Sequence, residues 1–131
     1  MQVLTLTTVM LVWFQAKHFI ADYLLQPHWV LTGKGDMRKS GGYVHAGVHA
    51  LGSIPAYLIA GLGTTGICSL MLAEFVIHYI IDYSKAGMSS RSHAGPDKAA
   101  YWAMHGADQF AHQLTYAALI YVSLRLTGAG G

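Results

Sequence analysis

The sequence has only one cysteine, Cys68, which lies in the apolar run GICSLMLAEF. A single cysteine excludes an intrachain disulfide and a metal cluster held by several thiolates. The sequence also lacks a GxSxG motif, which disfavours a covalent mechanism with a serine nucleophile. We expect Cys68 to be a small buried apolar residue.

Charged residues are also scarce. They make up 11% of the 131 residues, whereas hydrophobic residues make up 53%. This balance is far more apolar than that of an ordinary soluble protein of this size, and it predicts one integral-membrane domain over residues 1–131 with the lipid bilayer as a partner. The formal net charge is only +2 and the basic residues are scattered, so no nucleic-acid partner is expected.

Four apolar segments, residues 3–25, 43–62, 65–83 and 103–126, are each close to the roughly 20 residues that cross a bilayer as a helix. Polar stretches rich in Gly, Pro and Ser follow the first and third segments, and the short turn GLGTTG joins the second to the third. The sequence therefore predicts an all-α fold, a bundle of four transmembrane helices in up-down order. The alternative is a soluble four-helix protein, but the segment 65–83 lacks the wide polar face of a soluble bundle helix.

Basic residues predict the orientation of this bundle. The two polar loops contain Lys34, Arg38, Lys39, Lys85, Arg91 and Lys98. Because cytoplasmic loops carry an excess of Lys and Arg, both long loops are expected in the cytoplasm and both termini on the non-cytoplasmic side.

Each apolar segment contains one pair of ionisable residues spaced four apart: His18 and Asp22, His45 and His49, His78 and Asp82, and Asp108 and His112. Residues four apart lie on one helix face, about 6 Å apart along the axis. Alternating helix directions place all four pairs at one level near the cytoplasmic face. The deeper member of every pair is a histidine.

Eight ionisable side chains within a bilayer are costly unless a strong partner compensates them, and a divalent metal is the natural candidate. Imidazole nitrogen and carboxylate oxygen suit zinc, which we expect first, and also iron or manganese. Eight ligands exceed the four of a structural zinc site, so one or two ions would be bound. The alternatives are a histidine–carboxylate hydrogen-bond network that joins the helices, and a proton relay.

Weaker candidates surround these pairs. Glu74 lies one turn deeper than His78 and is a candidate general base or additional ligand. Lys17 cannot share the face of His18, so we expect its side chain to extend toward the membrane interface. Gln26, His105 and Gln109 flank the pairs and are expected to orient the ligands. A basic set in the second loop is a candidate for binding a substrate headgroup: Arg91, His93 and Lys98.

The motifs HxxxD with a following glutamine (His18, Asp22, Gln26), HxxxH (His45, His49), HxxxD (His78, Asp82) and DQxxH (Asp108, Gln109, His112) occur in this order. With this set the sequence resembles, over most of its length, an uncharacterised family of small bacterial and phage integral membrane proteins, catalogued as a domain of unknown function. That family is distantly similar to proteins named membrane-bound metal-dependent hydrolases. The resemblance implies a multi-pass protein of the bacterial inner (cytoplasmic) membrane.

The leading hypothesis is a metal-dependent membrane hydrolase that acts on a lipid-like ester or phosphoester arriving at the cytoplasmic interface, with Asp22, Asp82 or Glu74 accepting the proton of the attacking water. The HxxHH clusters of di-iron membrane hydroxylases are absent. Two non-enzymatic alternatives remain: a metal or proton binding or transport module, and an accessory subunit of a larger membrane complex. With four short helices, the chain would also suit a homo-oligomer.

Overall fold

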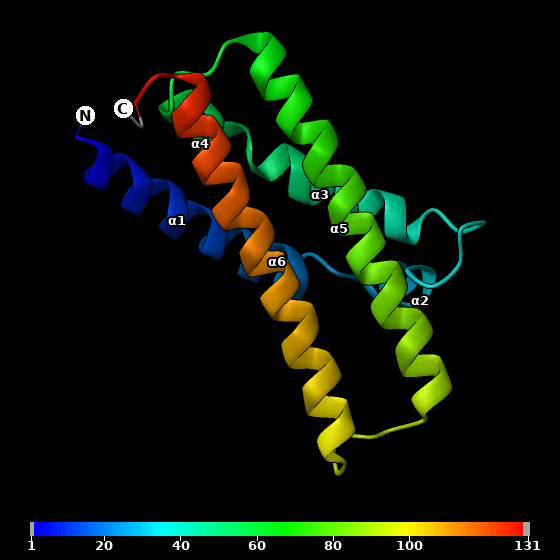
Figure 1. Cartoon of the computed structure of the whole chain (residues 1–131). Helices are drawn as coiled ribbons and strands as arrows, with labels where there is room; N and C mark the ends of the chain where they lie inside the picture. Colours follow the sequence, from blue (N-terminus) through cyan, green and yellow to red (C-terminus); the bar gives the residue numbers. More distant parts are fainter. Residues whose placement is uncertain (1, 130–131) are drawn as a thin grey trace.

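The computed structural model describes residues 2–129, and all regular secondary structure in that range is helical (Figure 1). The predicted all-α class is confirmed. In chain order, the elements are α1 (Val3–Phe19), the π-helical segment η1 (Ile20–Leu24), α2 (His28–Gly33), α3 (Gly41–Gly52), α4 (Ile54–Ile59), α5 (Thr64–Ser92) and α6 (Ala99–Leu126).

The long helices run back and forth along the bundle. Figure 1 shows both chain termini and the α4–α5 turn at one end, and the α5–α6 connection at the other. We call these the terminus end and the loop end. Helix α5 packs against α3 and α6, while α1 packs against α4 and α6. The up-down order of the apolar segments therefore places the interior-facing residues of all four side by side.

The predicted helix 43–62 is interrupted. It consists of α3 and α4, which meet at Ser53. Pro55, in the first turn of α4, has no backbone N–H to continue the hydrogen bonds of α3. The carbonyl of Gly52 instead accepts a hydrogen bond from Trp13 Nε1 at 2.8 Å, which ties the break to α1.

The first polar loop also differs from the prediction, because residues 28–33 form helix α2. This helix lies unusually close to α3. A Cβ atom on Gly41 would come within 2.7 Å of the Val30 carbonyl oxygen, so only glycine allows this approach. The close packing brings Lys34, the residue that follows α2, to the loop end of the bundle interior.

Two further boundaries differ from the sequence prediction. Helix α5 continues nine residues beyond position 83, to Ser92, and α6 begins at Ala99 rather than 103. Cys68 is exposed on α5 rather than buried, because it lies on the outer face of that helix.

Two helical stretches, Val3–Leu24 and Thr64–Ser92, are long and apolar enough to cross a bilayer by length and composition. Four such spans were predicted. The break at Ser53 makes α3 and α4 each too short, and α6 does not meet the same test over the described residues. Helix α6 contains Asp108 and Arg125 together with histidine and glutamine residues, which lower its mean hydropathy.

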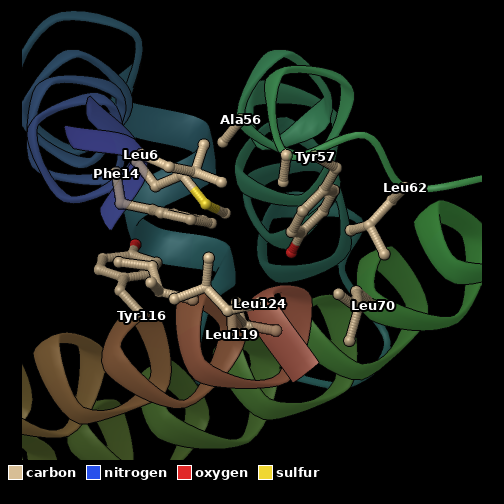
Figure 2. Close-up of a cluster of buried hydrophobic side chains, with 12 residues drawn as sticks. Leu6, Phe14, Ala56, Tyr57, Leu62, Leu70, Tyr116, Leu119 and Leu124 are labelled. Atoms are coloured by element: carbon tan, nitrogen blue, oxygen red, sulfur yellow. The ribbon is translucent and has the colours of Figure 1, made fainter. Parts of the chain in front are cut away.

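A cluster of buried apolar side chains fills the bundle toward the terminus end (Figure 2). Phe14 of α1 stacks on Tyr116 of α6 with ring centroids 5.1 Å apart, and it meets Tyr57 of α4 edge-on at 6.0 Å. Leu6, Leu70, Leu119 and Leu124 complete the packing from three helices. Farther toward the loop end, the buried residues include histidine, lysine and carboxylate side chains.

The outside of the bundle is apolar at the same time. Leu4 is 77% exposed, Leu72 65% and Phe110 63%. Toward the loop end, buried ionisable residues beneath an apolar exterior are the reverse of the arrangement in a soluble protein.

Candidate metal centre

The four predicted pairs meet inside the bundle. All their members are buried except Asp22, which is partly buried. The four histidines expected in the deeper layer form a closed ring, in which neighbouring imidazole centroids are 5.4 Å (His18–His49), 3.7 Å (His49–His78), 4.2 Å (His78–His112) and 5.1 Å (His112–His18) apart. The matched spacing in four helices thus produces one continuous cluster.

The first group of converging ligand atoms centres on Asp22. Its Oδ1 atom lies 3.0 Å from Nε2 of both His45 and His49. Together with His78, these residues each offer one ligand atom within 4.8 Å of the others. The π-helical turn η1 contributes Asp22, and such turns often occur at functional sites.

The second group consists of His78, Asp82 and His112, again with ligand atoms within 4.8 Å of one another. Asp82 lies 3.4 Å from Nε2 of both histidines. His78 belongs to both groups, but the lone pair of one imidazole nitrogen binds one ion. The residues could therefore hold one ion with three histidines and Asp22, or two ions with two histidines and one aspartate each.

Buried polar atoms without hydrogen-bond partners indicate whether a metal ion fits this centre. Nε2 of His45, His78 and His112 and one oxygen each of Asp82 and Asp108 have no hydrogen-bond partner among the described residues. The nearest ionisable atoms of neighbouring side chains are 2.9 to 3.5 Å away, but the contacts do not have hydrogen-bond geometry. Each such atom would cost about 1–3 kcal/mol if left unsatisfied. Nitrogen and oxygen lone pairs that converge without bonding to one another fit a shared divalent cation.

Tyr116 and Gln109 hold the remaining histidine in place. The Tyr116 hydroxyl lies 2.8 Å from His18 Nδ1 and 3.3 Å from His49 Nδ1, and Gln109 Oε1 lies 3.1 Å from His18 Nε2. A hydroxyl group can accept one hydrogen bond and donate another. Tyr116 can therefore accept a hydrogen bond from His49 Nδ1–H and donate its own to His18 Nδ1. Toward Asp22, His49 Nε2–H donates to Oδ1 at 3.0 Å, whereas the tautomer that donates from Nδ1 to Tyr116 would make the Nε2 lone pair available to an ion shared with Asp22.

Two lysines flank the centre on its loop side. Lys34 Nζ lies 2.9 Å from Asp82 Oδ2, and Lys85 Nζ lies 2.7 Å from Asp108 Oδ2. From the sequence, these lysines are expected only as cytoplasmic loop charges. The lysines instead reach the ligand carboxylates, because α2 packs on α3 and α5 continues as a helix past position 83.

A cleft of about 280 Å³ connects this centre to the loop end. Its lining includes Asp22, Asp82 and Asp108, both lysines, and the three residues predicted to orient ligands, Gln26, His105 and Gln109. The predicted headgroup residues lie elsewhere: Arg91, His93 and Lys98 are exposed and are not part of this lining. Lys98 pairs instead with its neighbour Asp97 at 3.1 Å.

Glu74 lies in a separate buried network on the other side of the histidines. It forms an ion pair with Lys17 and accepts hydrogen bonds from Ser53 Oγ at 2.5 Å and from the Tyr57 hydroxyl at 3.2 Å. Lys17 also donates to the His49 carbonyl at 2.8 Å. Lys17 is thus buried rather than extended toward the interface, because the Glu74 carboxylate compensates its charge inside the bundle.

Comparison with known proteins agrees with the motif pattern. A family model described as "Protein of unknown function (DUF3307)" matches residues 8–129, a range that includes all four pairs. The chain belongs to this DUF3307 family. No curated protein and no solved structure matches it. The predicted resemblance to an uncharacterised family is confirmed, while the more distant similarity to metal-dependent hydrolases stays a prediction.

Within this DUF3307 chain, six of the eight predicted ligands belong to the two converging groups. His18 and Asp108 lie directly beside them, with His18 Nε2 3.3 Å from Asp22 Oδ2 and Asp108 Oδ1 3.5 Å from His112 Nε2. The sequence pattern treats the four pairs alike, whereas the structure gives each a different set of neighbours. Lys34, Lys85 and Tyr116 are the polar neighbours that the pattern did not single out.

The shared position of His78 leads to the first prediction. His78→Ala removes one of the three histidines of a one-ion site, or one ligand of one ion in a two-ion site, so we expect it to lower the zinc bound per chain, measured after chelator washing and reloading. His18→Ala should retain most of the metal, because His18 lies outside both groups. His28→Ala, which changes an exposed histidine of the same chain, is the matched control. Full metal occupancy in His78→Ala would contradict the shared ligand.

The Lys17–Glu74 pair leads to the second prediction. Lys17→Met or Glu74→Gln leaves one charge buried without its partner, and each should lower the free energy of unfolding by about 3–5 kcal/mol. The double variant should lose much less than the sum of the two, which denaturant unfolding in detergent would measure. Lys98→Met, which removes only an exposed ion pair, should stay within about 0.5 kcal/mol of wild type. Additive losses in the double variant would show that the two side chains are not coupled.

Proposed function

We propose that this protein is a membrane-embedded, divalent-metal-dependent hydrolase that acts on a lipid-like phosphoester or ester. The observation that carries the proposal is a cleft whose lining includes one carboxylate of each ligand group, Asp22 and Asp82. A metal that only stapled helices together would need no cleft. Zinc is the ion we expect first, since its coordination chemistry suits imidazole and carboxylate ligands with an open position for water.

The distribution of apolar surface supports a membrane location. Only 28% of the residues in the apolar window of Val3–Leu24, and 17% in that of Thr64–Ser92, are buried. The core helix of a soluble protein would bury most of its residues. Exposed Val12, Ile80 and Phe110 show that α1, α5 and α6 all present apolar side chains outward. We propose the bacterial inner membrane as the site, with the loop end facing the cytoplasm because its loops carry the excess of basic residues.

The closed terminus end favours a hydrolase over a transporter. A transport path would need polar access to the site from both ends of the bundle. The polar interior does continue from the histidine ring to Glu74, but the apolar cluster around Phe14, Tyr57 and Leu119 follows it (Figure 2). Substrate and water would therefore reach the centre from the loop end alone.

A divalent ion bound at this centre would supply Lewis-acid activation of water and of the substrate oxygen. Asp22 and Asp82 belong to the ligand groups, and Glu74 is fully engaged by Lys17, Ser53 and Tyr57. Asp108 is the carboxylate that remains: it lines the cleft and lies outside both groups, and its Oδ1 atom has no hydrogen-bond partner among the described residues. We assign Asp108 Oδ1 the role of accepting the proton from the attacking water.

The neighbours of Asp108 fit this role. Lys85 and Gln109 both contact Oδ2, at 2.7 and 3.2 Å, and thereby hold the carboxylate with Oδ1 free. His112, 3.5 Å from Oδ1, belongs to the second ligand group and places the proton acceptor beside a ligand residue. Because Lys85 is about one third exposed, it connects this carboxylate to the solvent side of the cleft.

The third prediction separates proton transfer from metal binding. Asp108→Asn should retain the metal and the melting temperature of wild type but lose turnover by about a hundredfold or more, because a general base typically contributes that much. Asp22→Asn should lose metal, since Asp22 Oδ1 lies within one ligand group. The assay measures bound metal, thermal stability and product release from phospholipid and prenyl-phosphate substrates.

Two outcomes of this assay would count against the proposal. Wild-type turnover in Asp108→Asn would remove Asp108 from the proton-accepting role. Fully metal-loaded wild-type protein that releases no product from any phosphoester or ester in the panel would contradict the hydrolase itself.

A further inference from the structure

The two lysines of the cleft are placed between the centre and the solvent. Lys34 follows α2 and Lys85 lies in α5, so the two ammonium groups come from different segments of the chain. Both line the cleft, and their side chains are 11% and 34% exposed. Each lysine contacts an oxygen of a carboxylate that also lies beside a histidine of the centre. This carboxylate is Asp82 for Lys34 and Asp108 for Lys85.

The charge of the cleft depends on metal binding. Asp22, Asp82 and Asp108 contribute three negative charges, and the two lysines contribute two positive charges, so the lining carries −1 with neutral histidines. One divalent ion would change this to +1, and two would change it to +3. If Asp82 binds a cation, it holds Lys34 less strongly, which leaves ammonium N–H groups of Lys34 available for an anion. Lys85 is about one third exposed, and an ammonium group has three N–H donors, so Lys85 can contact an anion while it still donates to Asp108.

A second hollow adjoins the cleft. This groove, of about 240 Å³, lies between α5 and α6 and shares Lys85 and Asp108 with the cleft. The rest of its lining is mainly apolar and includes Ile80, Met88, Met104 and Ala107. A cationic cleft and an apolar groove that meet at one lysine match a molecule with an anionic head and a hydrocarbon chain.

We propose that Lys34 and Lys85 bind the phosphate group of a lipid phosphate whose hydrocarbon chain lies in the groove between α5 and α6. This inference rests on the proposed metal-dependent function and names its substrate class. Lysine is a common phosphate ligand, and two ammonium groups from separate segments can each donate to a different phosphate oxygen. The exposed residues Arg91, His93 and Lys98 lie outside both hollows and take no part in this recognition.

Binding of phosphonates, which a hydrolase cannot cleave, tests the inference without turnover. The probes are radiolabelled methylphosphonate and dodecylphosphonate, added to zinc-loaded protein in maltoside detergent, and binding is followed by scintillation proximity. Lys34→Gln and Lys85→Gln should each weaken the binding of both phosphonates at least about tenfold, because each removes a charge-assisted hydrogen bond. Lys39→Gln, an exposed lysine of the same loop, is the control and should bind like wild type.

A second part of the experiment tests whether the hydrocarbon chain of the ligand lies in the groove. Ala107→Phe fills the groove and should weaken dodecylphosphonate alone, whereas Ala118→Phe, the same change at an exposed α6 position outside the groove, should not. Metal content and melting temperature of each variant verify that it is folded and loaded.

Three results would overturn the inference. The first is wild-type phosphonate affinity in both lysine variants, and the second is weaker phosphonate binding in Lys98→Gln instead. The third is dodecylphosphonate binding no tighter than methylphosphonate, which would indicate a site for free phosphate. Failure of the hydrolase can be told apart from failure of this inference. Lysine-dependent phosphonate binding by a protein that cleaves nothing would contradict only the hydrolase. Turnover of lipid phosphates that is insensitive to both lysine substitutions would contradict only the recognition proposed for them.

Discussion

The structure depends on how a largely apolar helical bundle compensates the ionisable groups in its interior. Burying one unpaired charge costs more than most single contacts contribute, so these groups persist only where partners converge on them. The irregular features of the fold all serve this convergence. The π-helical turn carries Asp22, the close approach of Gly41 to α2 brings in Lys34, and Ser53 at the break between α3 and α4 donates to Glu74.

The interior changes character in steps along the bundle. From the terminus end it passes from the apolar cluster to the Lys17–Glu74 pair, then to the histidine ring, and then to the carboxylates and lysines of the cleft. The His49 carbonyl, which accepts from both Lys17 and Ser53, joins the ion pair to the ring. Among residues 2–129, this ordering places the polar cleft at the loop end and apolar packing at the terminus end, which supports the proposal of chemistry on an incoming molecule over that of transport.

Much of the centre could be predicted from the sequence, because residues four apart on a helix share a face whatever the helix packs against. The pattern therefore located all four pairs and the histidine ring. It could not rank the pairs, because the difference between His18 and His49 arises from Tyr116 and Gln109 on another helix. The burial of Lys17 and the contacts of Lys34 and Lys85 likewise depend on tertiary packing. Pro55 did signal the break at Ser53, but a length-based interpretation of an apolar run passes over a single proline.

The central claim is that the converging histidines and aspartates form a metal centre rather than a hydrogen-bond network. X-ray absorption at the metal edge of purified, chelator-washed and zinc-reloaded protein tests it most directly. We predict stoichiometric metal with two or three imidazole nitrogens and at least one carboxylate oxygen about 2.0–2.2 Å from the ion, and the imidazole signal should fall in His78→Ala. Folded protein that retains no metal, or metal without imidazole ligands, would contradict it.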